Sequence, residues 1–331
     1  MTPQRRAVGL TPMETRRDVI VRAAVLADEL GYETFAVPEG WGLDSVPLLT
    51  EIALRTSRIQ VVSGVLSVWG RTPATLAMTA ATLHQVSGGR FVLGLGASTS
   101  ALAEGFHDTA FDRPAAKVRD VVTKVRALLD GRPAELGAGS TARPLRLGQP
   151  PVPDLPIWIA ALGRQTTNVA AELGDGWIPA LVGRDHLPDW AAQLGRRRDA
   201  VAPDAAALTV AAGPIAVAGD DSRTARQIAA ACAAWYVSAM GDVYAMSLRN
   251  QGYATEVDAI IAANPSPSPG RATVPPEAQD LLDQLAVYGT PDQVQSQLDA
   301  WDKAADIVSI LVPPGLPWDI VEATLRAAAP D

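Results

Sequence analysis

Acid–imidazole pairs are the residues of this chain best suited to moving a proton near neutral pH. Imidazole has an unperturbed pKa of about 6.5, so a histidine donates or accepts a proton at physiological pH. Of the three histidines, His107 lies in the polar stretch STSALAEGFHD (98–108), with Glu104 three residues before it. Glu104 can orient the imidazole if this stretch is helical; alternatively, it begins a helix and His107 only packs. We expect His84 inside a helix and His186 in a surface loop, so His107 is the histidine we favour for chemistry.

Two glycines, Gly94 and Gly96, interrupt the apolar run in GGRFVLGLGAST (88–99). A dinucleotide-binding turn reads G-x-G-x-x-G in the first strand–helix unit and has an acidic residue about 20 positions further on. Here the sixth position is Thr99 and the run is the fourth predicted strand, so we reject a Rossmann-type turn. Either the glycines only let a strand end pack closely, or they expose backbone to a ligand. We favour the ligand and expect both glycines at the end of the strand, not inside it.

A second glycine turn precedes a predicted helix in AALGRQTTNVAAELG (160–174). The free N–H groups and the dipole at a helix N-terminus favour an anion such as a phosphate. The groups concerned belong to Gly163, Arg164, Gln165 and Thr166. Arg164 adds a full positive charge. An ordinary helix cap explains the same glycine, so the residues alone leave both interpretations open.

The composition limits the partners of the chain. A formal net charge of −8 over 331 residues lacks the basic footprint of a nucleic-acid-binding protein and argues against anionic membrane surfaces. The single cysteine, Cys232, cannot form an internal disulfide, and no Cys/His cluster has the spacing of a metal site. The first residues lack the apolar core of a signal peptide, and no run of about 18 apolar residues is present. We therefore expect a soluble, cytoplasmic protein that binds no metal, nucleic acid or membrane.

Short apolar segments alternate with amphipathic helical stretches along almost the whole chain. The predicted strands are 7–10, 34–38, 59–65, 90–96, 155–162, 176–181, 208–218 and 306–314. Most are followed by a helix, and the third shows no polar alternation, as expected for a parallel sheet covered on both faces. Their number and the chain length favour an α/β fold of the (β/α)8 TIM-barrel type, with a doubly wound sheet as the alternative. We expect one domain over residues 1–331, with excursions near 131–154 and 232–276.

Several long motifs of the chain resemble those of one protein family and occur in the same order. They include LADELGYETFAVPE, TLHQVSGGRFVLGLGAS, PIWIAALGRQTTNVAAELGDGWIP and YGTPDQVQSQLDAW. These segments are similar to the bacterial luciferase-like superfamily. More narrowly, they resemble its oxidoreductases that depend on the deazaflavin coenzyme F420, relatives of methylenetetrahydromethanopterin reductase. The likeness covers almost the whole chain and implies a luciferase-like TIM barrel with excursions, in agreement with the strand count.

The resemblance also implies where the coenzyme lies. A cis peptide bond between Gly64 and Val65, at the end of the third predicted strand, would back the deazaflavin ring. Ser98 and Thr99 would hydrogen-bond the ring or the substrate. The coenzyme phosphate would lie at the second glycine turn, with Ala161, Leu162, Gly163, Arg164, Gln165 and Thr166. The alternatives are an ordinary trans strand end and a bare helix cap.

The family often carries an acid followed by a histidine where this chain has VPEGWG (37–42). Glu39 matches the acid, but Gly40 replaces the histidine, so the acid/base chemistry of the glucose-6-phosphate-type relatives is not expected unchanged. Glu39 is either a carboxylate facing the coenzyme ring or a surface residue. Trp41 and Trp69, just past strand ends, are the candidates for an aromatic wall of the substrate pocket, although core packing is the commoner role of tryptophan.

We therefore expect an enzyme that transfers a hydride between a small organic substrate and coenzyme F420. The candidate catalytic residues are His107, Glu39 and Glu104, and a homodimer is expected because family members commonly dimerise. Two alternatives stay open. One is an FMN-dependent monooxygenase of the same fold, and the other is a non-catalytic flavin-binding relative, which the missing histidine at Gly40 slightly favours.

Overall fold

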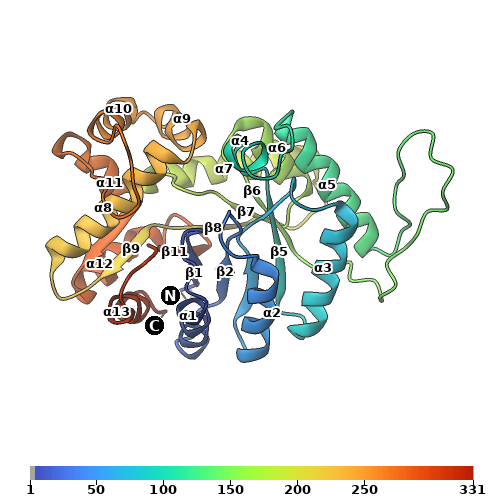
Figure 1. Cartoon of the computed structure of the whole chain (residues 1–331), viewed down its shortest axis with the longest axis horizontal. Coiled ribbons are helices and arrows are strands. Elements are labelled where there is room, and N and C mark those ends of the chain that lie inside the picture. Colours follow the sequence, from blue (N-terminus) through green and yellow to red (C-terminus); the bar gives the residue numbers. More distant parts are fainter. Residues whose placement is uncertain (1–3, 331) are drawn as a thin grey trace.

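Eight parallel strands close into a barrel in the structure, a computed structural model that describes residues 4–330 (Figure 1). Around the ring they are β1 (Arg6–Leu10), β2 (Thr34–Val37), β3 (Gln60–Ser63), β5 (Phe91–Gly96), β6 (Ile157–Ala160), β7 (Gly176–Ile178), β8 (Thr209–Ala212) and β11 (Ile307–Val312). Ala7 of β1 lies opposite Thr34 of β2 on one side and Ser309 of β11 on the other, which closes the ring. The predicted (β/α)8 barrel is confirmed, and a doubly wound open sheet is excluded.

Helices cover the outside of the barrel (Figure 1), and their buried apolar residues belong to one cluster with those of the strands. They are α1 (Arg17–Glu29), α2 (Ser45–Arg55), α3 (Pro73–Val86), α5 (Pro114–Leu129), α6 (Arg164–Leu173), α7 (Leu187–Val201), α12 (Pro291–Trp301) and α13 (Trp318–Ala327). Thr72 caps α3 by accepting a hydrogen bond from the N–H group of Thr75, with Pro73 in the first turn, as the sequence predicts. β1 and β5 are buried along their whole length, because their side chains face either the helices or the barrel interior.

The segment predicted as one strand over 208–218 is two strands. β8 belongs to the barrel, whereas β9 (Ile215–Ala218) begins beside Leu311 of β11 and then pairs with β10 (Ala286–Gly289), a strand that the sequence analysis did not predict. The break falls at Gly213 and Pro214. A Cβ atom on Gly213 would lie 2.4 Å from the carbonyl oxygen of Ser309, and the carbonyl of Pro214 accepts the N–H of Leu311 at 2.8 Å. The chain therefore bends where β11 approaches most closely.

The two predicted excursions differ in character. Residues 131–154 contain no helix or strand and project from the barrel between α5 and β6 (Figure 1). The region near 232–276 is largely helical, with the end of α8 (Ser222–Ala239), then α9 (Asp242–Asn250) and α10 (Ala254–Ala263). Together with α11 (Gln279–Leu285), these helices pack on β9 and β10 around a second apolar cluster. Within residues 4–330 no single helix is long and apolar enough to cross a membrane; α8 and α9 pass that test only as a pair bent by 103°.

Candidate active site

A cis peptide bond between Gly64 and Val65 interrupts the sheet at the end of β3. It lies between Ser63 and the two-residue strand β4 (Leu66–Ser67), which pairs with the end of β5. Both residues of the bond are half-buried, and the N–H group of Gly64 donates to the carbonyl of Val37 at 2.9 Å. The cis bond that the resemblance implies is thus confirmed. It lies at the carboxyl ends of the strands, the face on which TIM-barrel enzymes carry their active sites.

Close contacts with this bulge explain the glycines of β5. A Cβ atom on Gly94 would lie 1.8 Å from the carbonyl oxygen of Ser63, and one on Gly96 would lie 2.9 Å from Cγ2 of Val65. The Ser63 hydroxyl accepts from the Gly94 N–H at 2.8 Å and donates to the Gly94 carbonyl at 3.0 Å. Gly96 ends β5 as predicted, but the prediction was wrong for Gly94, which lies inside the strand. The physical reason is the approach of the neighbouring backbone.

Trp69 supports the loop that follows β5. Its indole N–H group donates to the carbonyl of Ala97 at 2.7 Å, and its ring centroid lies 5.5 Å from that of Phe111. The ammonium group of Lys117 lies 5.6 Å from the Trp69 ring. These contacts hold Trp69 in place. Through its hydrogen bond to Ala97, Trp69 fixes the start of the loop that follows β5.

His107 packs against the residue that follows Trp69. A Cβ atom on Gly70 would lie 3.1 Å from Cε1 of His107, whose side chain is half-buried. Glu104 directly follows the short helix α4 (Ser100–Ala103), and its carboxylate accepts a hydrogen bond from the N–H group of Phe111 at 3.1 Å. Within residues 4–330 no hydrogen bond or ion pair joins Glu104 to His107. The imidazole is positioned by packing, and Glu104 instead braces the loop that carries it.

Glu39 forms an ion pair that the sequence analysis did not indicate. Its carboxylate accepts from the guanidinium group of Arg71, which also donates to Asp44 at 2.9 Å. Only 9% of the Glu39 side chain and 16% of the Arg71 side chain are exposed. Burial by itself lowers the pKa of Arg71, but its bonds to Glu39 and Asp44 raise that pKa above the ordinary value. Glu39 is therefore a charge-compensated carboxylate and not a free surface residue.

The sequence contains a signal for the pairing of Arg71 with Glu39. Val37 lies opposite Ser63 in the parallel pair β2–β3, so the loops that follow these strands are neighbours. An acid in the loop after β2 can therefore meet an arginine in the loop after β3, just before the N-cap residue of α3. Glu39 and Arg71 are such residues, at the same end of adjacent strands.

Gly40, where the resemblance implies a histidine, has no space for a side chain. A Cβ atom on Gly40 would lie 2.6 Å from Cβ of Pro12, in the segment between β1 and α1. The next residue, Trp41, is 44% exposed, and its ring centroid lies 6.3 Å from that of Trp235 in α8. The loop after β2 thus packs on the segment after β1 on one side and reaches α8 on the other.

The first turn of α6 carries an open set of donors. Gly163 is the N-cap residue, and no side chain within residues 4–330 caps this helix. The Thr166 hydroxyl donates back to the carbonyl of Gly163 at 2.9 Å, and Arg164 and Gln165 are exposed. Arg164 has no ion-pair partner in the described part of the chain. Such a helix start suits a phosphate.

The remaining predicted residues flank these groups. Ala161 is buried and its carbonyl accepts the indole N–H of Trp177 at 2.8 Å, whereas Leu162 is half-buried. Ser98 adopts a left-handed backbone with a φ of 57°, and Thr99 is the N-cap residue of α4. The structure therefore gathers the predicted site residues at the carboxyl ends of β2, β3, β5 and β6, which are neighbours in the ring.

The other histidines and possible metal ligands lie elsewhere. His84 is in α3, as predicted, and His186 ends a 3-10 turn, with its ring centroid 5.4 Å from that of Tyr253. Within the described residues, no group of three or more His, Cys, Asp or Glu side chains could hold a metal ion.

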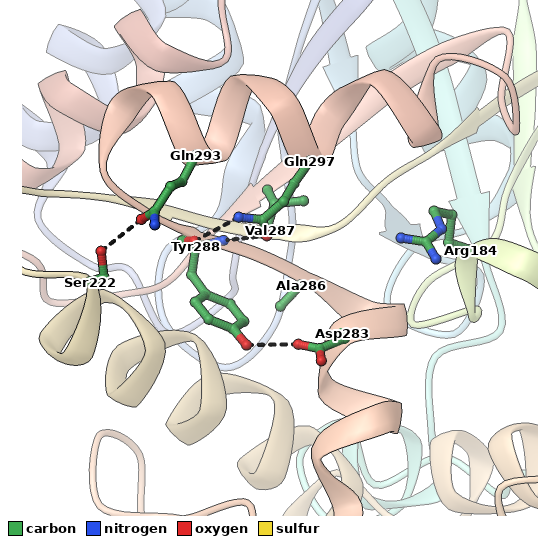
Figure 2. Close-up of a pocket in the computed structure, with 8 residues that line it drawn as sticks. All are labelled: Arg184, Ser222, Asp283, Ala286, Val287, Tyr288, Gln293 and Gln297. Carbon is green, nitrogen blue, oxygen red and sulfur yellow. Dashed lines mark hydrogen bonds between the residues drawn. The ribbon is translucent and has the colours of Figure 1, made fainter.

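A cavity of about 330 Å³ lies apart from these residues, beside the edge strand β10 (Figure 2). It is lined by Arg184, Ser222, Asp283, Ala286, Val287, Tyr288, Gln293 and Gln297. Most of the polar groups bond to one another: Tyr288 donates its hydroxyl to Asp283 at 2.7 Å, and Ser222 donates to Gln293 at 2.7 Å. The amide of Gln297 accepts from the Tyr288 N–H and donates to its carbonyl, which protects the strand edge. We therefore interpret this cavity as a structural feature of the sheet edge at β10.

A TIM barrel with a cis bulge and convergent polar groups at the carboxyl ends of its strands has the architecture of an enzyme. The sequence profile of the luciferase-like monooxygenase family matches residues 1–306. The chain belongs to this family, and the resemblance seen in its motifs is confirmed.

Individual relatives agree with this assignment. A protein of Mycobacterium tuberculosis that is named as a coenzyme F420-dependent oxidoreductase is 28% identical over 337 residues, covering 93% of this chain and 92% of that protein. The coenzyme F420-dependent tetrahydromethanopterin reductase of Methanopyrus kandleri has a TM-score of 0.77 at 19% identity, covering 99% and 98% of the two chains. The oxygenating constituent of 3,6-diketocamphane monooxygenase from Pseudomonas putida, in complex with FMN, has a TM-score of 0.68 at 16% identity, covering 98% and 97%. These two structures share the barrel fold.

Proposed function

We propose that the chain is an oxidoreductase that transfers a hydride between a small organic substrate and coenzyme F420. The observation that carries this proposal is the half-buried Gly64–Val65 bulge at the barrel mouth. At the two positions of β5 that approach this bulge, Gly94 and Gly96, the strand has no side chain. The relative in M. tuberculosis supports F420 as the coenzyme. When bound, the deazaflavin supplies a ring carbon that gives or takes the hydride.

The residues on this face fit a phosphorylated coenzyme with a flat ring. The uncapped start of α6 and the unpaired Arg164 would hold the phosphate, with the N–H groups of the first turn as donors. Gly64 and Val65 would lie against the ring, and the half-buried Ser98 and Thr99 would offer it hydrogen bonds. The protein then has to orient the substrate and move one proton.

Proton transfer is assigned first to His107 and second to Glu39. Arg71 holds the Glu39 carboxylate in an ion pair, so Glu39 is the second candidate. His107 has no carboxylate partner within residues 4–330 and packs on Gly70 at the barrel mouth, and histidine is the side chain that most often serves as a general acid or base. Glu104 would contribute through the loop that carries His107, because its carboxylate is engaged by the backbone N–H of Phe111.

The decisive experiment is a titration of the purified protein with F420 and with FMN, side by side. Arg164→Glu places a negative charge at the proposed phosphate site and should weaken F420 binding by about 1–3 kcal/mol, the range for hydrogen bonds to charged groups. Arg143→Glu, an equal charge change in the exposed 131–154 excursion, is the control and should bind F420 as the unmodified protein does. Equal weakening by both variants would show a general charge effect and would move the phosphate elsewhere.

The proton assignment needs turnover measurements. His107→Ala should lower the turnover rate by at least about 100-fold with coenzyme binding intact, since a positioned acid or base contributes about 10²–10⁴-fold. If His107→Ala keeps its rate and Glu39→Gln abolishes it, the role belongs to Glu39. If both variants stay active, the proton comes from solvent or from the substrate.

The FMN-dependent monooxygenase is the second candidate, because the FMN complex from P. putida shares this fold. Oxygen consumption with reduced FMN would favour it, and coenzyme binding without turnover would favour a non-catalytic relative. We further propose a cytoplasmic homodimer, which a mass measurement in solution tests.

A further inference from the structure

Two large apolar side chains are exposed in the loops at the barrel mouth. Trp41, after β2, is 44% exposed, and Phe106, after β5, is 57% exposed. We call these two side chains the apolar rim. Large apolar side chains left in water next to a functional face mark a surface that binds something.

Aromatic contacts link Trp41 to helices α8 and α9. The centroid of Trp41 lies 6.3 Å from that of Trp235, which meets Tyr236 edge-on at 5.5 Å. Tyr236 in turn meets Tyr244 of α9 edge-on at 5.4 Å. These contacts hold α8 and α9 beside the loop after β2, so the rim has a rigid aromatic base on this side.

The other part of the rim borders the proposed proton carrier. Phe106 meets the ring of His107 edge-on at 5.2 Å, and His107 packs on Gly70. The neighbouring Arg71 reaches Glu39, two residues before Trp41. Contacts through the segment that carries Gly70 and Arg71 therefore connect the loop of Phe106 with the loop of Trp41.

The arginines around the rim are already compensated by carboxylates. The pairs are Arg71 with Glu39 and Asp44, Arg113 with Asp112, and Arg249 with Asp258. Lys117 is turned over the ring of Trp69. The uncompensated Arg164, by contrast, lies at the start of α6, where the coenzyme phosphate is proposed. Among the residues that the structure describes, these three arginines offer a substrate phosphate or carboxylate no unpaired guanidinium group.

We infer that the substrate of this enzyme is a neutral, apolar, ring-bearing molecule whose ring lies against Trp41. The inference rests on the proposed function, since it places the substrate beside the coenzyme site, and it adds the substrate class. An uncharged ring gains from contact with an indole face and does not need an unpaired arginine.

The test uses two probes with the same ring and different charge, 2-naphthol and 2-naphthyl phosphate, titrated into the full-length protein by calorimetry. We expect saturable binding of 2-naphthol and at least about 10-fold weaker binding of the phosphate. Trp41→Ala should weaken 2-naphthol at least about 10-fold, and Trp41→Phe, which keeps a ring, should weaken it less. Leu54→Ala removes an exposed apolar side chain on the outside of the barrel and should change nothing.

Several results would overturn the inference. Equal or tighter binding of the phosphate would refute the neutral class, and affinity unchanged in Trp41→Ala would refute the rim as the site. If neither probe binds, or if Trp41→Ala converts an oligomer to a monomer in light scattering, the rim belongs to a protein interface. F420 titrated in parallel separates the two proposals. If Trp41→Ala loses F420 binding, Trp41 belongs to the coenzyme site. If the unmodified protein does not bind F420 but binds 2-naphthol in a way that depends on Trp41, only the proposed function is refuted.

Discussion

Adding a single methyl group to β5 should separate two kinds of close contact at the bulge. In Gly94→Ala the new Cβ would lie 1.8 Å from a backbone oxygen of Ser63, and ordinary contacts begin at about 3.4 Å. The two strands must therefore move apart by more than an ångström, which also breaks the bonds of 2.8 and 3.0 Å between the Ser63 hydroxyl and Gly94. Overpacking of this kind costs about 1–3 kcal/mol, and each lost hydrogen bond about 1 kcal/mol. We expect a loss of about 4 kcal/mol.

Gly96→Ala should cost less, because its close contact is with a side chain. The added Cβ would lie 2.9 Å from Cγ2 of Val65 and 3.2 Å from Cβ of Ala160. We expect a loss of about 1–2 kcal/mol. Val65→Ala removes the Cγ2 methyl group, so in the double variant the cost of Gly96→Ala should largely vanish. The same Val65→Ala change should not rescue Gly94→Ala, whose contact is with backbone.

Denaturant unfolding followed by far-UV circular dichroism measures these free energies, and the double-mutant cycle gives the coupling between positions 65 and 96. Gly195→Ala is the matched control, since no atom lies within 4 Å of its added Cβ and it lies inside α7. It should gain about 0.5–1 kcal/mol. A Gly94→Ala variant as stable as Gly96→Ala, or rescued by Val65→Ala, would refute the backbone approach as the reason for Gly94.

Two sets of substitutions and one labelling experiment test the charges and the thiol. Arg71→Gln leaves Glu39 buried without its cation and should lower the free energy of unfolding by about 3 kcal/mol. Much of this loss should be regained in the double variant with Glu39→Gln. Equal losses in the single and double variants would contradict the pairing. Burial alone would raise the pKa of Asp28, but backbone N–H groups of residues 57–59 lower it below its ordinary value. Its stabilisation is thus present above about pH 4 and lost as the pH falls through the lowered pKa, so Asp28→Asn should flatten acid unfolding curves. Burial raises the pKa of Cys232 to about 12, so Ellman's reagent should label it only in denaturant, and labelling of the native protein would contradict the buried position.

The barrel strands could be predicted because each is a continuous apolar run between helix and turn signals. The bend at Gly213 and Pro214 could not, since both halves of the segment are apolar and buried. Only the approach of β11, with the carbonyl of Ser309 at 2.4 Å from a Cβ on Gly213, fixes the break. β10 was missed for a related reason: its four residues follow α11 without a turn, and they pair with a strand about 70 positions earlier in the sequence.

The positions of the site residues could be predicted, but their partners could not. Strand ends are visible in the sequence, and in a (β/α)8 barrel they converge on one face. The expected pairing of Glu104 with His107 required a helix through both, but α4 ends at Ala103, so the three-residue spacing no longer brings the side chains together. Glu104 binds the backbone of Phe111 instead.

Gly40 does not by itself argue for a protein that has lost its chemistry. A histidine at position 40 is excluded, because Pro12 fills the space that the Cβ atom of such a histidine would occupy. The acid before it is not left alone, because Arg71 provides the positive charge next to Glu39. A guanidinium group stays charged at every accessible pH, so it fixes the carboxylate but cannot exchange a proton. His107, the proposed proton carrier, lies outside this pair and packs on Gly70, the residue before Arg71.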